Sequence, residues 1–164
     1  MSVYACADFH GAYWFWEGVK SILQPDDKLF FLGDAIDRGS NGMDILKILI
    51  NDPRVFFLKG NHEDMMVQCW KDCQNEDDYY WNYWNYSLWV QNDSKSTYQS
   101  FMKIPLEIRR KYVVFLSKLD KETYYINKKG QTIIMNHAGY IPNIRKKIKE
   151  GNPYFWDREH FNDS

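Results

Sequence analysis

The chain has 164 residues, enough for one domain with a sizeable hydrophobic core. Hydrophobic residues make up 45% of it and aromatic residues 18%, a composition that argues against intrinsic disorder. The net charge of -1 gives no general attraction to nucleic acid, three cysteines suit a reducing compartment, and no apolar run reaches the length of a membrane span. We therefore expect a cytoplasmic protein, without a signal peptide, that binds neither nucleic acid nor a membrane.

The first 70 residues are predicted to form three successive units of strand, polar motif and helix. A strand at 3–7 leads into Asp8-Phe9-His10-Gly11 and a helix at 12–23 with apolar residues at helical spacing. The continuous apolar run at 29–32 predicts a buried strand, followed by Gly33-Asp34-Ala35-Ile36-Asp37-Arg38-Gly39 and a helix at about 43–50. A third strand at 55–58 leads into Gly60-Asn61-His62-Glu63 and a helix through Trp70. This alternation predicts a largely parallel sheet with right-handed crossovers.

The predicted strands end in residues of the kinds that bind metal ions. Together the three strand ends deliver Asp8, His10, Asp34, Asn61 and His62. Carboxylate, amide and imidazole groups suit hard or borderline divalent metals. Taken singly, these residues would fit an ordinary loop, a surface histidine or an ion pair in a turn. No structural need accounts for them at three successive strand ends, so the pattern favours a metal site.

Residues 74–100 interrupt the alternation with an acidic run and then a dense set of tryptophans and tyrosines. These aromatic residues fit either a wall that faces the substrate or, as the more usual case, a helical cap packed on the domain. Pro105 is predicted to open a helix that ends near Leu119, and β-rich runs at 122–127 and 131–136 predict a hairpin.

Two further features are interpreted as structural. The basic run at 145–149 is short and local, so a solvated helix face accounts for it better than a nucleic-acid patch. Cys69 and Cys73 have no further metal ligands beside them and are interpreted as small buried apolar groups.

Five motifs, in family order, resemble those of the calcineurin-like metallophosphoesterases. They are Asp8-x-His10, Gly33-Asp34-x-x-Asp37-Arg38-Gly39, Gly60-Asn61-His62-Glu63, Asn136-His137-Ala138-Gly139 and Phe155-Trp156-Asp157-Arg158-Glu159. The Asp-Arg-Gly and His-Glu endings resemble the phosphoprotein phosphatase branch found in phages and bacteria. Residues 90–97 resemble that branch's Trp-x-x-Asn-Gly-Gly-x-x-Thr stretch, with Asp93-Ser94 in place of the glycines.

The resemblance implies an α/β fold, a metallophosphoesterase-type β-sandwich flanked by helices. The chain length predicts a single domain over 1–164, in which we expect residues 74–120 to form a helical cap-like insertion. The family continues to a Gly-His pair that completes its second metal site, and this sequence contains no such pair. We therefore expect a fold whose C-terminal strands are missing and a second metal site that is short of one histidine.

Two divalent metal ions are implied by the same resemblance. The first would be held by Asp8, His10 and Asp34. The second would be held by Asp34, Asn61 and His137, so that the two oxygens of Asp34 bridge the ions. Manganese is the expected metal, with iron and zinc as alternatives.

The remaining site residues are expected to handle the proton and the phosphate. His62, held by Asp37, would protonate the leaving group without binding metal. Arg38 and Arg158 would bind the phosphate oxygens, and Lys59 stands where relatives often have another basic residue.

The expected function is metal-dependent hydrolysis of phosphomonoesters by an activated water. The expected substrates are phosphoserine and phosphothreonine in proteins, or a small phosphoester. One alternative is hydrolysis of diadenosine polyphosphates. A second is a non-catalytic remnant that binds metal or phosphate.

Overall fold

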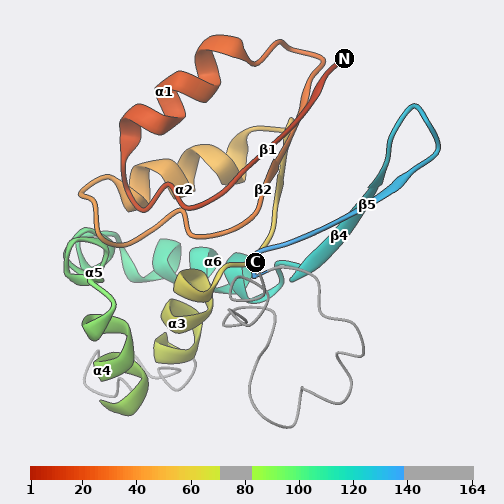
Figure 1. Ribbon diagram of the computed structural model, residues 1–164. Coiled ribbons are helices and arrows are strands. Elements are labelled where there is room, and N and C mark those ends of the chain that lie inside the picture. Colours follow the sequence, from red (N-terminus) through yellow and green to blue (C-terminus); the bar gives the residue numbers. More distant parts are fainter. Residues whose placement is uncertain (71–82, 139–164) are drawn as a thin grey trace, which may run out of the picture.

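The computed structural model describes residues 1–70 and 83–138 of the chain. The described strands are β1 (Val3–Cys6), β2 (Lys28–Phe31), β3 (Val55–Phe57), β4 (Glu122–Ile126) and β5 (Thr132–Asn136). The described helices are α1 (Tyr13–Ile22), α2 (Gly42–Asn51), α3 (Asn61–Trp70), α4 (Tyr83–Gln91), α5 (Lys95–Met102) and α6 (Leu106–Ser117), and Figure 1 shows their arrangement. Cys73, the basic run at 145–149 and the motif at 155–159 lie outside the described residues.

The first three strands form a parallel sheet in the order β1-β2-β3, as the alternation of strands and helices predicts. The central strand carries the continuous apolar run, because it is covered on both faces. Leu29 and Phe31 are fully buried and belong to the main core, whereas Phe30, between them, belongs to a second cluster. Successive side chains of β2 point to opposite faces of the sheet, so this strand contributes buried residues to the core on each face.

Helices α1 and α2 cover one face of this sheet, and Figure 1 shows them side by side there. The hairpin β4–β5 contacts the other face, where Tyr125 lies with its ring 6.1 Å from that of Phe30 and Met135 packs with Leu58. The parallel sheet thus has a helical layer on one face and the hairpin packed against part of the other. This arrangement also carries the end of β5 to the edge of the sheet where the three polar motifs lie.

Helices α4, α5 and α6 occupy the described part of the predicted cap at 74–120, and α3 contacts both α4 and α6. The described aromatic residues pack inward: Trp89 is fully buried, and Tyr86 and Tyr98 form an edge-to-face pair across α4 and α5. For these residues the packing interpretation holds. None of the described helices combines the length and apolar character that a membrane crossing requires.

Candidate metal centre and proton donor

The first two polar motifs lie side by side because the ladder between β1 and β2 continues past the ends of the strands. The backbone N–H of Asp8 donates to the carbonyl of Gly33 (3.0 Å), and that of His10 donates to the carbonyl of Asp34 (2.9 Å). In a parallel sheet the carboxyl ends of all strands meet at one edge. Motifs that are far apart in the sequence therefore lie close together in space.

Glycines allow the loops to approach more closely than a Cβ atom would permit. A Cβ on Gly33, whose φ is +98°, would lie 2.5 Å from backbone atoms of Gly60. A Cβ on Gly11, whose φ is +69°, would lie 2.6 Å from the carbonyl oxygen of Gly39. Backbone atoms cannot yield as a flexible side chain can, so these contacts fix the loops against one another.

The backbone of the site is strained at the residues that sequence analysis singled out. Five non-glycine residues there have φ between 44° and 72°, in the left-handed region that side chains disfavour: Asp8, His10, Asp34, Asp37 and Arg38. Such conformations cost roughly 1–3 kcal/mol each and cluster at functional sites. The strain is maintained by the contacts of the surrounding loops.

The buried carboxylate of Asp34 is the centre of the cluster. Its Oδ2 lies 3.3 Å from Nε2 of His137, 3.6 Å from Nε2 of His10 and 3.9 Å from Nε2 of His62. Nε2 of His10 is also 3.6 Å from Oδ1 of Asp8, whose side chain is 60% exposed. The cluster therefore opens to solvent on the side of Asp8.

Two of the three histidines are held by backbone carbonyls. Nδ1 of His137 lies 2.8 Å from the carbonyl oxygen of Leu32, and Nδ1 of His10 lies 3.1 Å from that of Ile36. A proton on Nδ1 satisfies each carbonyl, and the lone pair of a neutral ring then lies on Nε2, directed at Asp34. This is the tautomer that a metal ligand needs.

The charges of the cluster shift its pKa values. Burial alone would lower the pKa of His137, but the hydrogen bond and charge of Asp34, with the carbonyl of Leu32, raise it to about 9. Burial alone would raise the pKa of Asp34, but the hydrogen bond and charge of His137 bring it below its usual value. The imidazolium of His137 thus compensates the carboxylate in the chain alone, as a cation would.

His62 is anchored differently from the other histidines, since its partner is a carboxylate. Its Nδ1 lies 2.7 Å from Oδ2 of Asp37, and both side chains are fully buried. The same Oδ2 accepts a hydrogen bond from the indole Nε1 of Trp89, also at 2.7 Å. Nε2 of His62 is buried and has no hydrogen-bond partner among the described residues. The ring thus presents an unengaged nitrogen toward Asp34.

Glu63, for which the sequence indicated no role, organises the backbone of the site. Its fully buried carboxylate accepts hydrogen bonds from the N–H groups of Asp34, Ala35 and Gly60 at 2.8, 2.8 and 3.0 Å. Burial, together with the charge of Asp34, raises the pKa of Glu63 to about 6. The only sequence signal was its place at the end of the third motif. Helix α3 begins at Asn61, so Glu63 lies in its first turn, where a carboxylate is favoured.

Trp89 and Thr97 were also missed as site residues. The hydroxyl oxygen of Thr97 accepts a hydrogen bond from the N–H of Asp37 at 2.8 Å. Thr97 ends the stretch at 90–97 that resembles Trp-x-x-Asn-Gly-Gly-x-x-Thr, and Trp89, immediately before that range, stands at the tryptophan of the pattern. This resemblance was the available signal. Asp93, at the first glycine position, keeps the left-handed conformation that a glycine would adopt readily, with φ of 61°.

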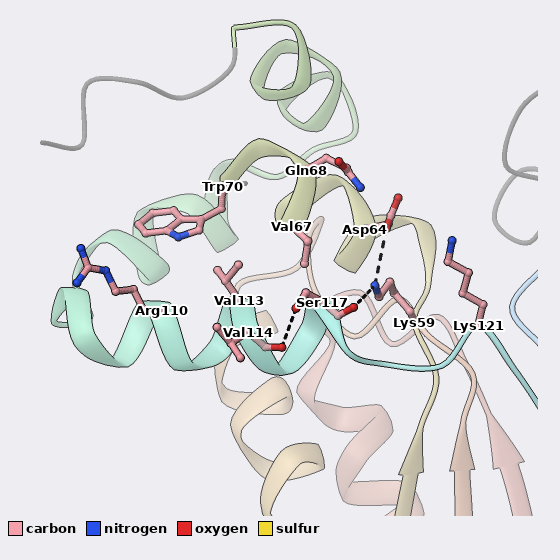
Figure 2. A pocket seen from close by; sticks show the side chains of 10 residues that line it. All are labelled: Lys59, Asp64, Val67, Gln68, Trp70, Arg110, Val113, Val114, Ser117 and Lys121. Atoms are coloured by element: carbon pink, nitrogen blue, oxygen red, sulfur yellow. Dashed lines mark hydrogen bonds and ion pairs between the residues drawn. The ribbon is translucent and has the colours of Figure 1, made fainter. Parts of the chain in front are cut away.

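The predicted phosphate-binding residues differ in their placement. Arg38 is exposed. Arg158 lies outside the described residues. Lys59 is buried, donates to the carbonyl of Ser117 at 3.0 Å and lies 4.0 Å from Asp64. Lys59 lines a cavity of about 720 Å³ between α3 and α6. Figure 2 shows its ammonium group directed at Asp64 and at the carbonyl of Ser117. The ammonium group of Lys59 therefore binds Ser117 and Asp64 beside that cavity.

The donor set fits a divalent cation. One group whose ligand atoms lie within 4.8 Å of one another consists of His10, Asp34 and His62, and a second consists of Asp8, Asp34 and His137. Oδ1 of Asn61 lies 2.8 Å from Nε2 of His137, which adds an amide oxygen to the second group. Oxygen and imidazole donors of this kind suit manganese, iron or zinc.

The chain is similar to known proteins in sequence and in fold. A sequence profile described as calcineurin-like phosphoesterase matches residues 1–162. Serine/threonine-protein phosphatase 2 of Escherichia coli strain K12 is 33% identical over 72 residues, which are 42% of this chain and 33% of that protein. A candidate serine/threonine-protein phosphatase of Caenorhabditis elegans is 47% identical over 49 residues, 26% of this chain and 13% of the relative.

Among solved structures, a candidate diadenosine tetraphosphatase superposes with a TM-score of 0.53 and 18% identity, over 88% of this chain and 58% of that one. This match confirms the expected α/β fold class. In each of these three comparisons, the match spans less than two thirds of the relative's own length.

Proposed function

Because this chain belongs to the calcineurin-like phosphoesterase family, we propose that it hydrolyses phosphomonoesters, with phosphoserine and phosphothreonine in proteins as its substrates. The observation that carries the proposal is the position of Asp34. Its carboxylate lies at the centre of the metal-type cluster and also within 3.9 Å of the unengaged nitrogen of His62. Phosphoester hydrolysis requires metal ions that activate water and an acid that protonates the leaving group, and this site would place the two side by side.

The family is one of dinuclear metal-dependent enzymes. The donor groups in the structure overlap with the ligand sets that the family's motifs imply but do not match them, since His62 lies with His10 and Asp34, and Asp8 lies with Asp34 and His137. We assign the ligands as the motifs imply. Asp8, His10 and Asp34 would hold one ion, and Asp34, Asn61 and His137 would hold the other. When bound, the two ions neutralise the phosphate and activate the attacking water. We propose manganese, with iron and zinc as the alternatives that the same donors accept.

His62 is the proposed general acid. As the P–O bond breaks, its electron pair stays on the leaving oxygen, which takes the proton from Nε2 of His62. Asp37 holds the ring from the opposite nitrogen, 2.7 Å away. Arg38 and Arg158 would bind the phosphate oxygens through their planar guanidinium groups.

Two other functions are weighed against this one. Hydrolysis of diadenosine polyphosphates draws support from the superposed structure, but only at the level of the fold. A remnant that merely binds metal or phosphate has no use for a buried acid–base pair, and that pair is present. The relatives found by sequence favour a protein substrate. A cytoplasmic location remains our prediction from the cysteine content.

To test the proposal, the purified chain is assayed with three substrates: a phosphoserine peptide, diadenosine tetraphosphate and an aryl phosphate. Each is measured with and without manganese. We expect turnover of the aryl phosphate and the peptide that disappears on exhaustive chelation and returns with manganese. Turnover of the dinucleotide alone would support the second function. Equal turnover in the presence of the chelator would overturn the metal-dependent mechanism.

A further inference from the structure

The carboxylate of Asp37 receives two donors on one of its oxygens. Oδ2 accepts hydrogen bonds from Nδ1 of His62 and from Nε1 of Trp89, each at 2.7 Å. Oδ1 is buried and has no hydrogen-bond partner among the described residues. An aspartate side chain turns easily about its last bond, because that torsion is broad. A carboxylate held by the imidazole alone could therefore turn together with it.

Trp89 supplies a donor whose position is fixed by the core. The residue lies in α4, is fully buried and packs edge to face on Tyr98 of α5, with 6.5 Å between the ring centroids. An indole has one N–H donor on a rigid double ring, so packing of the ring determines where the donor points. Its contact with Asp37 joins residues that are 52 positions apart in the sequence.

The same segment of chain also holds the backbone around Asp37. Thr97 accepts a hydrogen bond from the N–H of Asp37 at 2.8 Å, and the carbonyl of Asp93 accepts one from the N–H of Arg38 at 2.9 Å. Asp37 and Arg38 both have left-handed backbone conformations, which need such support. Segment 89–97 thus restrains both the main chain and the side chain of Asp37.

We propose that Trp89 is a positioning residue: its indole N–H holds the carboxylate of Asp37 in the orientation that aims His62 at the leaving group. The described helices α4 and α5 then do more than cover the domain, because efficient proton donation depends on them. The kinetic consequence rests on the function proposed above, whereas the hydrogen bond itself does not.

Trp89→Phe tests the kinetic consequence, because it keeps a buried aromatic ring and removes the N–H. We expect turnover of an alkyl phosphate to fall by roughly 10–100-fold, the usual effect of removing a supporting partner of a site residue. Turnover of a nitrophenyl phosphate should change by less than about 3-fold, since a good leaving group needs little protonation. Trp16→Phe, in the buried face of α1, is the matched control and should give the same ratio between the two substrates as the unsubstituted chain.

The difference between the losses of turnover on the two substrates distinguishes a positioning role of Trp89 from a merely structural one. A Trp89→Phe chain that loses both activities equally, or neither, would overturn the proposal. A second measurement needs no turnover and no metal: the seven indole N–H groups of the ¹⁵N-tryptophan-labelled chain are followed by NMR. We expect one indole proton that exchanges slowly with solvent and whose resonance alone shifts strongly in Asp37→Asn.

If Asp37→Asn left every indole resonance in place, the hydrogen bond would be absent and the proposal wrong, whether or not Trp89→Phe folds. If the unsubstituted chain hydrolysed no phosphoester, the proposed function would fail. The indole spectrum would then still decide whether Trp89 holds Asp37.

Discussion

His62 and Asp37 form a fully buried pair in which Nδ1 of the imidazole lies 2.7 Å from Oδ2 of the carboxylate. The other histidines of the cluster, His10 and His137, are anchored by backbone carbonyls instead. A partner at Nδ1 fixes the orientation of an imidazole ring and the direction in which its Nε2 points. The anchoring group thus differs between the proposed acid and the proposed ligands.

The first prediction concerns His62→Ala. We expect turnover of an alkyl phosphate to fall by about 10²–10⁴-fold, the usual contribution of a positioned acid, with a much smaller loss for a nitrophenyl phosphate. Bound manganese, measured by elemental analysis of the purified chain, should not change. The imidazole lies within 4.8 Å of other donors, so a loss of metal would show that His62 is a ligand.

The second prediction concerns Asp34→Asn. Oδ2 of Asp34 lies 3.6 Å or less from Nε2 of both His10 and His137, so an amide there would replace a charged acceptor at the centre of the cluster. We expect manganese affinity, measured by calorimetric titration, to fall by more than about 100-fold, beyond the effect of losing an outer partner. Asp26→Asn, on the exposed surface, is the control and should bind metal normally. Unchanged affinity in Asp34→Asn would remove this residue from the ligand set.

The third prediction compares two glycines. Gly33→Ala should lower the free energy of unfolding by at least about 2 kcal/mol, because the left-handed backbone alone costs roughly 1–2 kcal/mol and the new Cβ meets Gly60. Gly18→Ala lies within α1, where an added Cβ has nothing within 4 Å. It should raise the free energy of unfolding by up to about 1 kcal/mol, since alanine favours helices. Urea denaturation measures both, and equal effects would contradict the close approach of Gly33 and Gly60.

The fourth prediction concerns pH. The Arg54 guanidinium, which donates to both oxygens of Asp52 at 2.9 and 2.6 Å, lowers the pKa of that carboxyl. A lowered pKa in the folded state stabilises the fold above the ordinary pKa of 3.8, and this stabilisation is lost as the pH falls through the folded value.

Asp52→Asn should therefore be less stable than the unsubstituted chain at pH 7, by at most about 1 kcal/mol for a partly exposed pair. The difference should shrink as the pH falls below 3.8. Urea denaturation at several pH values measures it, with Asp26→Asn as the control. A difference that stayed constant with pH would mean that the pair does not act through charge.

The local pattern of the sequence determined the elements around the site. The helix predicted at 12–23 is found at Tyr13–Ile22, the strand predicted at 29–32 at Lys28–Phe31, and the predicted hairpin as β4 and β5. These elements are recognisable because apolar spacing, glycine and proline act over a few neighbouring residues. The parallel order of the strands then follows, and it brings Asp8, Asp34 and Asn61 to one edge.

Only the tertiary structure decided which groups hold the proposed acid. Trp89 and Thr97 reach Asp37 from 52 and 60 positions away, and Glu63 spans two motifs through three backbone N–H groups. The sequence by itself determined which residues stand at the ends of the strands, because that depends on local periodicity. Which oxygen of Asp37 is engaged, and which nitrogen of each histidine faces Asp34, depends on packing between distant elements, and no local pattern encodes it.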